Sequence, residues 1–240
     1  MSPVAALGSA WRRVRAVARP AGARRPAART FGYPVALDLA GRRVVVVGAE
    51  AVAHGKVGPL LAAGAFVTVV ADGDGLEELE DDPRVTLRRR AWQPEDLNGA
   101  FLCVAAPGPG VDGGAVYAAG RARGVLVNVL DDVPHCDFAA PAVVRRGHLA
   151  IAISTGGRSP ALARRLREEL GERFGPEWAG VVDLLGEVRA ETMPALPDFG
   201  DRARRWQRAL DTAELAAMVA DGRADEARAV LIARLLDGVE

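Results

Sequence analysis

The sequence has few cysteines and no long apolar run, and these two shortages exclude two classes of protein. Cys103 and Cys136 are the only cysteines among 240 residues, which is too few for a disulfide framework and favours a reducing, cytoplasmic compartment. No apolar run approaches the roughly 18 residues of a membrane-spanning helix, so no membrane partner is expected. With His54, His135 and His148, the cysteines show no zinc-ligand spacing, and we expect no metal site.

Acidic residues are missing from the start of the chain. The first of them is Asp38, so seven of the 31 basic residues precede every acidic one, and 24 basic side chains face 31 acidic ones in the rest. This mildly acidic body argues against a nucleic-acid partner. Residues 1–32 are rich in Arg, Ala and Pro and contain no run that could close a core. We interpret them as a disordered extension, with an arm for anionic surfaces or a targeting segment as alternatives.

What the sequence does contain is an alternation of apolar runs with helical stretches. The apolar runs are 44–47, 66–70, 85–87, 101–106 and 125–130. Continuous apolar strands separated by helical segments are typical of a parallel sheet covered on both faces. The sequence therefore predicts a doubly wound α/β domain over residues 33–138.

The pattern changes after Pro141. Two apolar runs around residues 145–148 predict a hairpin, and Ser159-Pro160 is a strong helix start because proline lacks an N–H that would be unpaired there. A hairpin with one helix cannot bury its own apolar face, so we expect residues 139–170 to form a small α+β dimerisation segment with a second copy. Residues 171–240 are expected to form a C-terminal helical domain with breaks near 194–200 and 221–222.

Gly48 follows the first predicted strand and precedes a helical stretch, which is where a Rossmann fold binds pyrophosphate. The rest of the usual glycine pattern is absent, so an ordinary strand-to-helix turn is an equally good interpretation. Asp72 follows the second strand about 20 residues later, as a ribose-binding carboxylate should, although Asp-Gly is also a common turn pair.

Three stretches together resemble the siroheme synthase N-terminal module, the family of precorrin-2 dehydrogenases and sirohydrochlorin ferrochelatases. They are residues 48–56, residues 128–142 and the stretch Ser154-Thr155-Gly156-Gly157-Arg158-Ser159-Pro160-Ala161-Leu162-Ala163, which is the most specific. The resemblance implies NAD-dependent oxidation of the tetrapyrrole precorrin-2 to sirohydrochlorin. In many members Fe²⁺ insertion follows and gives siroheme. It also implies a homodimer and a Rossmann-like doubly wound sheet. In these 240 residues we expect no copy of the methyltransferase domain that is fused to some members.

The resemblance also implies roles for individual residues. Asp131 matches the proposed catalytic aspartate, a general base for the proton that must leave after the hydride, and its alternative is a loop carboxylate. Asn128 is expected to organise that loop or to contact substrate. The remaining expected positions are, for NAD, Gly48, Ala49, Glu50, Ala51, Val52, Asp72 and Ala106, and, for substrate, Thr155, Gly156, Gly157 and Arg158. His135 and Cys136 as metal ligands are a minor alternative, and the resemblance gives Cys136 a packing position.

Two departures from the family pattern leave a second function open. Glu50 replaces a glycine and, about 5 Å from a phosphate, would repel it by about 3 kcal/mol at an effective dielectric of 20. Pointing outward, the same side chain would instead favour the helix dipole. Pro107-Gly108-Pro109-Gly110 replaces the Thr-Asp-rich loop usual beside the cofactor. The alternative function is therefore a degenerate, non-catalytic module that binds a tetrapyrrole or a nucleotide.

Overall fold

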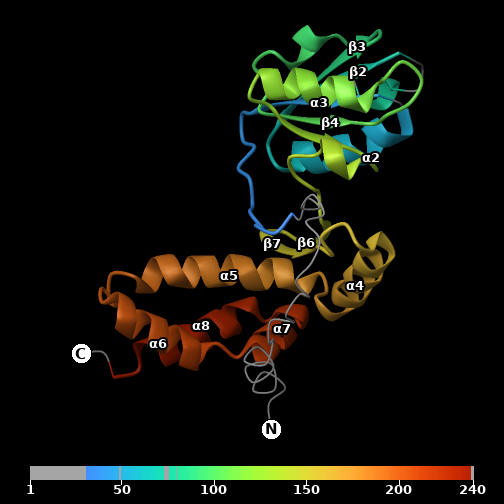
Figure 1. Cartoon of the computed structure of the whole chain (residues 1–240). Coiled ribbons are helices and arrows are strands. Elements are labelled where there is room, and N and C mark those ends of the chain that lie inside the picture. The colour runs from blue at the N-terminus through green and yellow to red at the C-terminus, as the bar shows by residue number, and fades with distance from the viewer. Residues whose placement is uncertain (1–30, 49, 73–75, 80, 239–240) are drawn as a thin grey trace, which may run out of the picture.

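A parallel sheet of five strands forms one end of the molecule in the computed structural model, which describes residues 31–48, 50–72, 76–79 and 81–238 (Figure 1). Its spatial order is β3-β2-β1-β4-β5. The strands are β1 (Arg43–Val47), β2 (Phe66–Ala71), β3 (Val85–Arg89), β4 (Leu102–Ala105) and β5 (Leu126–Val129). Because the order reverses between β1 and β4, the fold is the doubly wound, Rossmann-like sheet that the sequence predicted.

Two apolar layers cover the two faces of this sheet. Along β1, Val44 faces the layer that contains Val57 of α2 (Glu50–Ala62), whereas its neighbour Val45 faces the layer that contains Val116 of α3 (Gly113–Ala122). All these valines are fully buried. The two-residue alternation of side chains along a strand explains why every residue of the β-branched run is apolar.

The crossover from β3 to β4 contains a short 3-10 helix, η3 (Pro94–Leu97), in place of the predicted helical stretch. The buried Asp96 carboxylate fixes it by accepting hydrogen bonds from Arg88 (2.5 Å), Arg90 (2.6 Å) and the Gln93 backbone N–H (2.8 Å). Burial raises the pKa of Asp96, but the bonds from Arg90, Gln93 and Arg88 outweigh it and lower the pKa to about 2. The ion cluster of Asp96, Arg88 and Arg90 therefore holds the crossover against the sheet, where an apolar helix face would otherwise do so.

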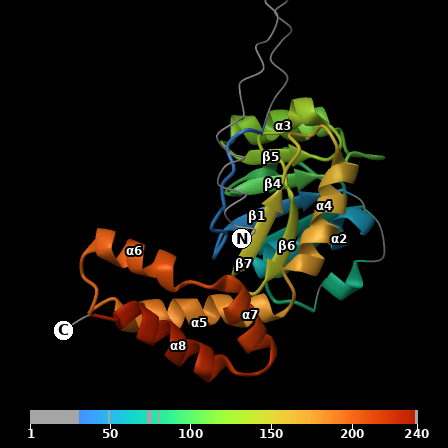
Figure 2. The same cartoon turned by 90° about the horizontal axis from the view of Figure 1, so that it is seen from below.

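A smaller unit follows the sheet. It consists of the antiparallel hairpin β6 (Ala142–Arg146) and β7 (Leu149–Ile153), with α4 (Pro160–Arg173) beside it. Ser159 is the N-cap of α4, as predicted, and its hydroxyl accepts a hydrogen bond from the Leu162 N–H (3.2 Å). Figure 2 shows α4 alongside the hairpin, away from the C-terminal helices.

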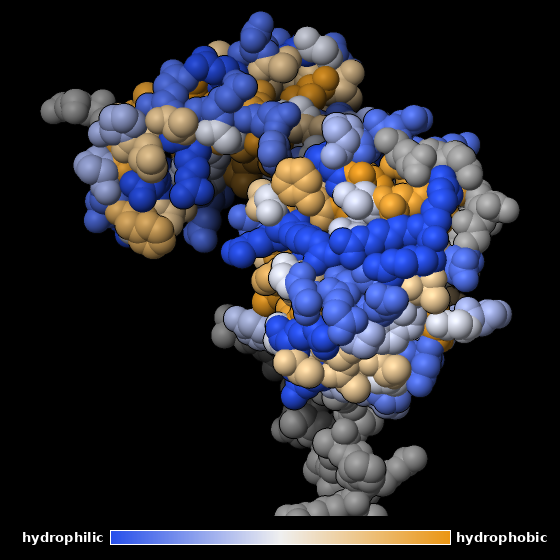
Figure 3. Space-filling model, turned by 90° about the horizontal axis from the view of Figure 1, so that it is seen from above, coloured by the Kyte–Doolittle hydropathy of each residue, from blue (hydrophilic) through white to orange (hydrophobic). Residues whose placement is uncertain are grey.

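The C-terminal helices pack into their own core, which includes Leu184, Leu215 and Leu231. The helices are α5 (Glu177–Thr192), α6 (Phe199–Ala209), α7 (Thr212–Ala220) and α8 (Ala224–Leu236). The predicted breaks separate α5 from α6 and α7 from α8. A further break, between α6 and α7, was not predicted; the Asp211 side chain caps α7 there by accepting from two backbone N–H groups. The space-filling view of Figure 3 shows hydrophilic side chains in a broad band over one face of the molecule, between smaller apolar patches.

Candidate functional site

The carboxyl ends of β1, β4 and β5 lie side by side and continue the sheet's hydrogen bonds into their loops. The Gly48 N–H donates to Val70 (3.0 Å), the Ala106 N–H to Val47 (2.8 Å) and the Leu130 N–H to Ala105 (2.9 Å). The first residues of three loops are thereby fixed by the sheet itself. In open α/β folds, ligands bind at this edge where the strand order reverses.

Gly48 occupies a position that no other residue could take unchanged. Its φ is 111°, and a Cβ built on it would lie 2.3 Å from the carbonyl oxygen of Ala106. The β1 turn and the end of β4 therefore approach as closely as bare backbones allow. This narrow turn at the switch point, followed by the first turn of α2, suits a dinucleotide pyrophosphate, which binds backbone N–H groups at a helix N-terminus.

The structure describes the other residues expected to bind NAD to different extents. Ala49 lies outside the described residues. Glu50, Ala51 and Val52 form the first turn of α2, and only their backbone is described. Asp72 directly follows β2 and is exposed, at the same edge of the sheet as Gly48, while Ala106 is buried against the Gly48 turn.

Asp131 follows β5 by two residues and has an unusual backbone. Its φ of 59° makes it the only non-glycine residue with a positive φ in the described part of the chain. For an L-residue the left-handed conformation costs of order 1 kcal/mol or more, and such strain is found at functional sites. The buried Asn128 supports the segment from inside, because its side-chain amide donates to the Phe138 carbonyl (2.9 Å).

A side-chain pair beside Asp131 was not predicted. The Nδ1 atom of His135 lies 2.6 Å from a carboxylate oxygen of Asp132, and the imidazole ring packs tilted against Tyr117 at 5.4 Å between centroids. Sequence reasoning considered His135 only as a metal ligand. The i, i+3 spacing from Asp132 across a short 3-10 helix, η4 (Val133–His135), is the signal that could have found the pair.

The loop between β7 and α4 is a compact, hydrogen-bonded turn. The Thr155 hydroxyl accepts from the Ser159 N–H (3.0 Å) and donates to the Ser159 carbonyl (3.2 Å). Gly156 and Gly157 have φ values of 61° and 78°, so both use the freedom that only glycine has. Arg158 is exposed, and no ion pair involves it among the described residues. The loop presents the exposed Arg158 guanidinium beside the N-terminus of α4, a favourable place for an anion.

The two loops that carry the predicted substrate residues lie next to each other. A Cβ built on Gly157 would be 4.0 Å from a methyl carbon of Val133, which is two residues beyond Asp131 and 41% exposed. The expected catalytic and anion-binding segments, far apart in the sequence, are therefore neighbours in one chain. The arrangement can hold a ligand whose anionic groups face the cationic loop while another part of it lies beside the Asp131 carboxylate.

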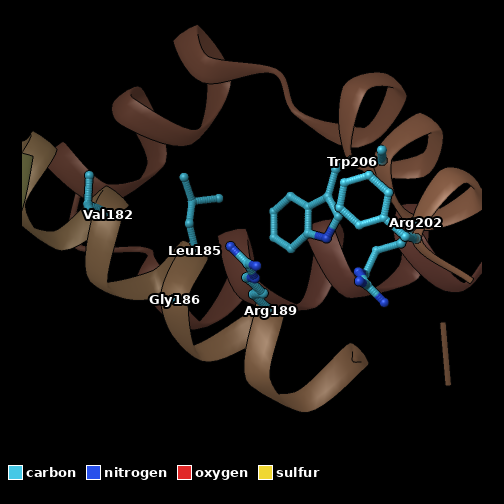
Figure 4. A pocket seen from close by; sticks show the side chains of 8 residues that line it. Val182, Leu185, Gly186, Arg189, Arg202 and Trp206 are labelled. Atoms are coloured by element: carbon cyan, nitrogen blue, oxygen red, sulfur yellow. The ribbon is translucent and has the colours of Figure 1, made fainter. Parts of the chain in front are cut away.

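A pocket of about 470 Å³ lies elsewhere, between α5 and α6 (Figure 4). Its lining includes Val182, Leu185, Arg189, Phe199, Arg202 and Trp206. Arg202 already donates to the Leu196 carbonyl (2.6 Å), so it ties the α5–α6 connection. All lining residues belong to those two helices, and the pocket is separate from the carboxyl edge of the sheet.

Within residues 31–238, apart from the undescribed positions, no three His, Cys, Asp or Glu side chains gather as metal ligands would. No described helix combines the length and the apolar character that crossing a bilayer requires.

Two family models match the chain in succession. Residues 35–142 match the family described as "Putative NAD(P)-binding", and residues 146–173 match the central part of sirohaem biosynthesis proteins. The first match ends at Ala142, the first residue of β6, and the second begins at Arg146, its last residue, and runs through β7 and α4.

Curated relatives and a solved structure agree with these matches. Siroheme synthase 2 of Yersinia pestis is 36% identical over 81% of this chain, and siroheme synthase of Methylococcus capsulatus is 36% identical over 83%. The chain spans about two fifths of the length of these relatives, 41% and 42%. The solved structure of SirC, a precorrin-2 dehydrogenase, superposes with a TM-score of 0.63 at 26% identity, covering 83% of this chain and 98% of that one. Over most of its length this chain is therefore similar to siroheme synthases and to a precorrin-2 dehydrogenase.

Proposed function

We propose that this protein is an NAD⁺-dependent dehydrogenase that oxidises precorrin-2 to sirohydrochlorin. The observation that carries the proposal is the placement of Asp131. It lies in a left-handed turn at the carboxyl edge of the sheet, the edge that also carries the Gly48 turn, and the loop at Gly157 lies beside Val133, two residues beyond it. The match to NAD(P)-binding proteins and the likeness to a precorrin-2 dehydrogenase support it.

Each loop has one task in this reaction. The Gly48 turn and the first turn of α2 would hold the pyrophosphate of NAD⁺. When bound, the nicotinamide ring of NAD⁺ would supply the hydride acceptor. Arg158 and the N-terminus of α4 bind carboxylates of the tetrapyrrole and so orient the macrocycle. Loss of a hydride leaves a cation that must release a proton, and the Asp131 carboxylate accepts it. The substrate thus loses one hydride and one proton, which yields sirohydrochlorin, NADH and H⁺.

We further propose that two copies of the chain form the working unit. In α4 only Ala163 is buried, while Leu162 is 50% exposed and Leu166 and Leu170 are half-buried. These leucines form one face of a helix that also carries the Arg158 loop. A second copy is the partner that would cover this face, and it would complete the substrate side of the site.

An anaerobic assay with precorrin-2 and NAD⁺ tests the proposed reaction. The account predicts NADH formation that depends on both reactants, together with the absorbance of sirohydrochlorin. The non-catalytic alternative predicts binding of a tetrapyrrole without NADH. Adding Fe²⁺ and purified sirohydrochlorin to the same protein determines separately whether it inserts the metal.

A further inference from the structure

The buried thiol of Cys136 lies directly beneath the Asp131 turn. Its sulfur is 3.0 Å from the Val129 carbonyl oxygen and 3.3 Å from the Asp132 carbonyl oxygen. These two carbonyls flank the segment that contains Asp131, so one thiol proton is shared between the two sides of the turn. Cys136 is only 4% exposed, which keeps water from competing for these bonds.

The sulfur also accepts a hydrogen bond. The side-chain amide of Asn128 donates to it at 3.4 Å while donating to the Phe138 carbonyl at 2.9 Å. Asn128 and Cys136 are also joined by a backbone bridge. A chain of polar groups therefore runs from the last strand of the sheet, through the sulfur, to the turn. Such chains fix geometry more firmly than single bonds, because each member polarises the next.

The left-handed backbone of Asp131 needs additional contacts to hold it. A non-glycine residue stays in the left-handed region only when its surroundings determine the conformation. Two backbone hydrogen bonds hold the residue after Asp131: the Asp132 N–H reaches the Val129 carbonyl at a long 3.3 Å, and the Asp132 carbonyl accepts from the His135 N–H at 3.0 Å. The Cys136 sulfur lies closer to the same Val129 carbonyl oxygen, at 3.0 Å.

Resting on the proposed dehydrogenase function, we propose that Cys136 is a positioning residue for Asp131. The thiol holds the turn in the conformation that presents the carboxylate to substrate, and it takes no part in bond making itself. It is neither a nucleophile nor a metal ligand in this role. The turn retains backbone bonds without the thiol, because the Val129 carbonyl keeps the Asp132 N–H and the Asp132 carbonyl keeps the His135 N–H. Its removal should therefore misplace Asp131 without unfolding the protein.

Kinetics of Cys136→Ala test the proposal. We expect kcat to fall about ten- to hundredfold, the effect of a small misplacement of a reacting group. KM for NAD⁺ and for precorrin-2 should stay within about twofold, since binding groups are untouched. Cys136→Ser should recover much of the loss, because its hydroxyl also donates. Cys103→Ala is the matched control: that thiol is equally buried, in β4, and should leave kcat unchanged.

A double mutant separates positioning from general damage. If Cys136 acts through Asp131, Cys136→Ala should cost nothing further in an Asp131→Asn background. A wild-type kcat in Cys136→Ala, a Cys136→Ser variant as slow as Cys136→Ala, or a second full loss in the double mutant would each overturn the proposal.

Amide hydrogen exchange tests, independently of turnover, whether the Cys136 thiol holds the Asp131 turn. The Asp132 N–H should exchange at least about tenfold faster in Cys136→Ala than in wild type or Cys103→Ala, because the turn opens more often. Equal exchange rates in all three proteins would overturn the proposal that the thiol holds the turn, even if the protein is an active dehydrogenase. If wild type forms no NADH, the proposed function fails, and exchange still tells whether the thiol holds the turn.

Discussion

A Cβ at position 48 would lie 2.3 Å from the carbonyl oxygen of Ala106, so the turn after β1 and the end of β4 leave no room for a side chain. This contact lies between the two strands where the strand order reverses. It explains why the first glycine of the dinucleotide pattern is kept in a sequence that has lost others.

Gly48→Ala should therefore weaken both folding and NAD⁺ binding. The clash and the φ of 111° require the backbone to move, at a cost of about 1–3 kcal/mol. We expect a lower melting temperature and an NAD⁺ affinity reduced by about tenfold or more, measured by calorimetric titration. Gly186→Ala in α5 is the control, since nothing lies within 4 Å of its Cβ; it should stabilise the helix slightly and leave NAD⁺ affinity unchanged. Equal affinity in both variants would remove Gly48 from the cofactor site.

Asp131→Asn keeps the shape of the side chain but removes its ability to accept a proton. We expect kcat to fall by about 10²–10⁴, the usual contribution of a positioned base. Affinities for NAD⁺ and sirohydrochlorin should stay within a few-fold. Asp132→Asn, which instead removes the negative charge from the partner of His135, should have a much smaller effect on kcat. A parallel collapse of rate and affinity in Asp131→Asn would mean that Asp131 holds ligand or structure.

Leu162→Asp should dissociate the proposed dimer. The side chain is 50% exposed on the uncovered face of α4, and a charge there would lose its water on association. Sedimentation should show a dimer for wild type and a monomer for the variant, and the unfolding midpoint of wild type should rise with concentration. Leu126→Asp, at the start of β5 and 37% exposed, serves as control and should remain dimeric. A wild-type monomer at every concentration would contradict the proposed assembly.

Acid should weaken the fold through Asp96. The pKa of this carboxyl is about 2 in the folded protein and 3.8 when unperturbed, so its ionised form favours folding. Its contribution of roughly 2 kcal/mol is fully present above about pH 4 and is lost as the pH falls towards 2.

Urea unfolding at pH 6 and pH 3 measures this contribution. Asp96→Asn should be less stable than wild type at pH 6, with the difference shrinking at pH 3. The control Asp82→Asn removes a carboxylate that is 30% exposed and paired with Arg84, and it should change the pH dependence less than Asp96→Asn does, because solvent screens a partly exposed pair. A difference between Asp96→Asn and wild type that stays constant with pH would contradict the assignment.

The sheet could be predicted because its buried strands appear in the sequence as short, continuous apolar runs. A strand covered on both faces must be apolar at every position, as Val44 to Val47 are, and such runs are rarely anything else. The start of α4 was equally legible from Ser159-Pro160. The break before α7 was missed although Asp211 and Glu214 have the spacing of a helix N-terminal box.

The candidate site was predicted residue by residue, but not its geometry. The left-handed backbone of Asp131 could not be predicted, because aspartate is enriched in that conformation but adopts it at only a small fraction of its positions. The approach of Gly157 to Val133 depends on the path of the hairpin between them. The contacts of the Cys136 thiol with the Asp131 turn followed only from the folded chain, since sequence reasoning weighed packing or metal binding for this residue.

A single-turnover experiment tests the central claim most directly. Enzyme in excess over precorrin-2 is mixed anaerobically with NAD⁺, and NADH and sirohydrochlorin are quantified together. The account predicts that both appear in equal amounts and at the same rate, and that Asp131→Asn slows both alike. Precorrin-2 that binds but yields no NADH, or sirohydrochlorin that forms without NADH, would contradict it.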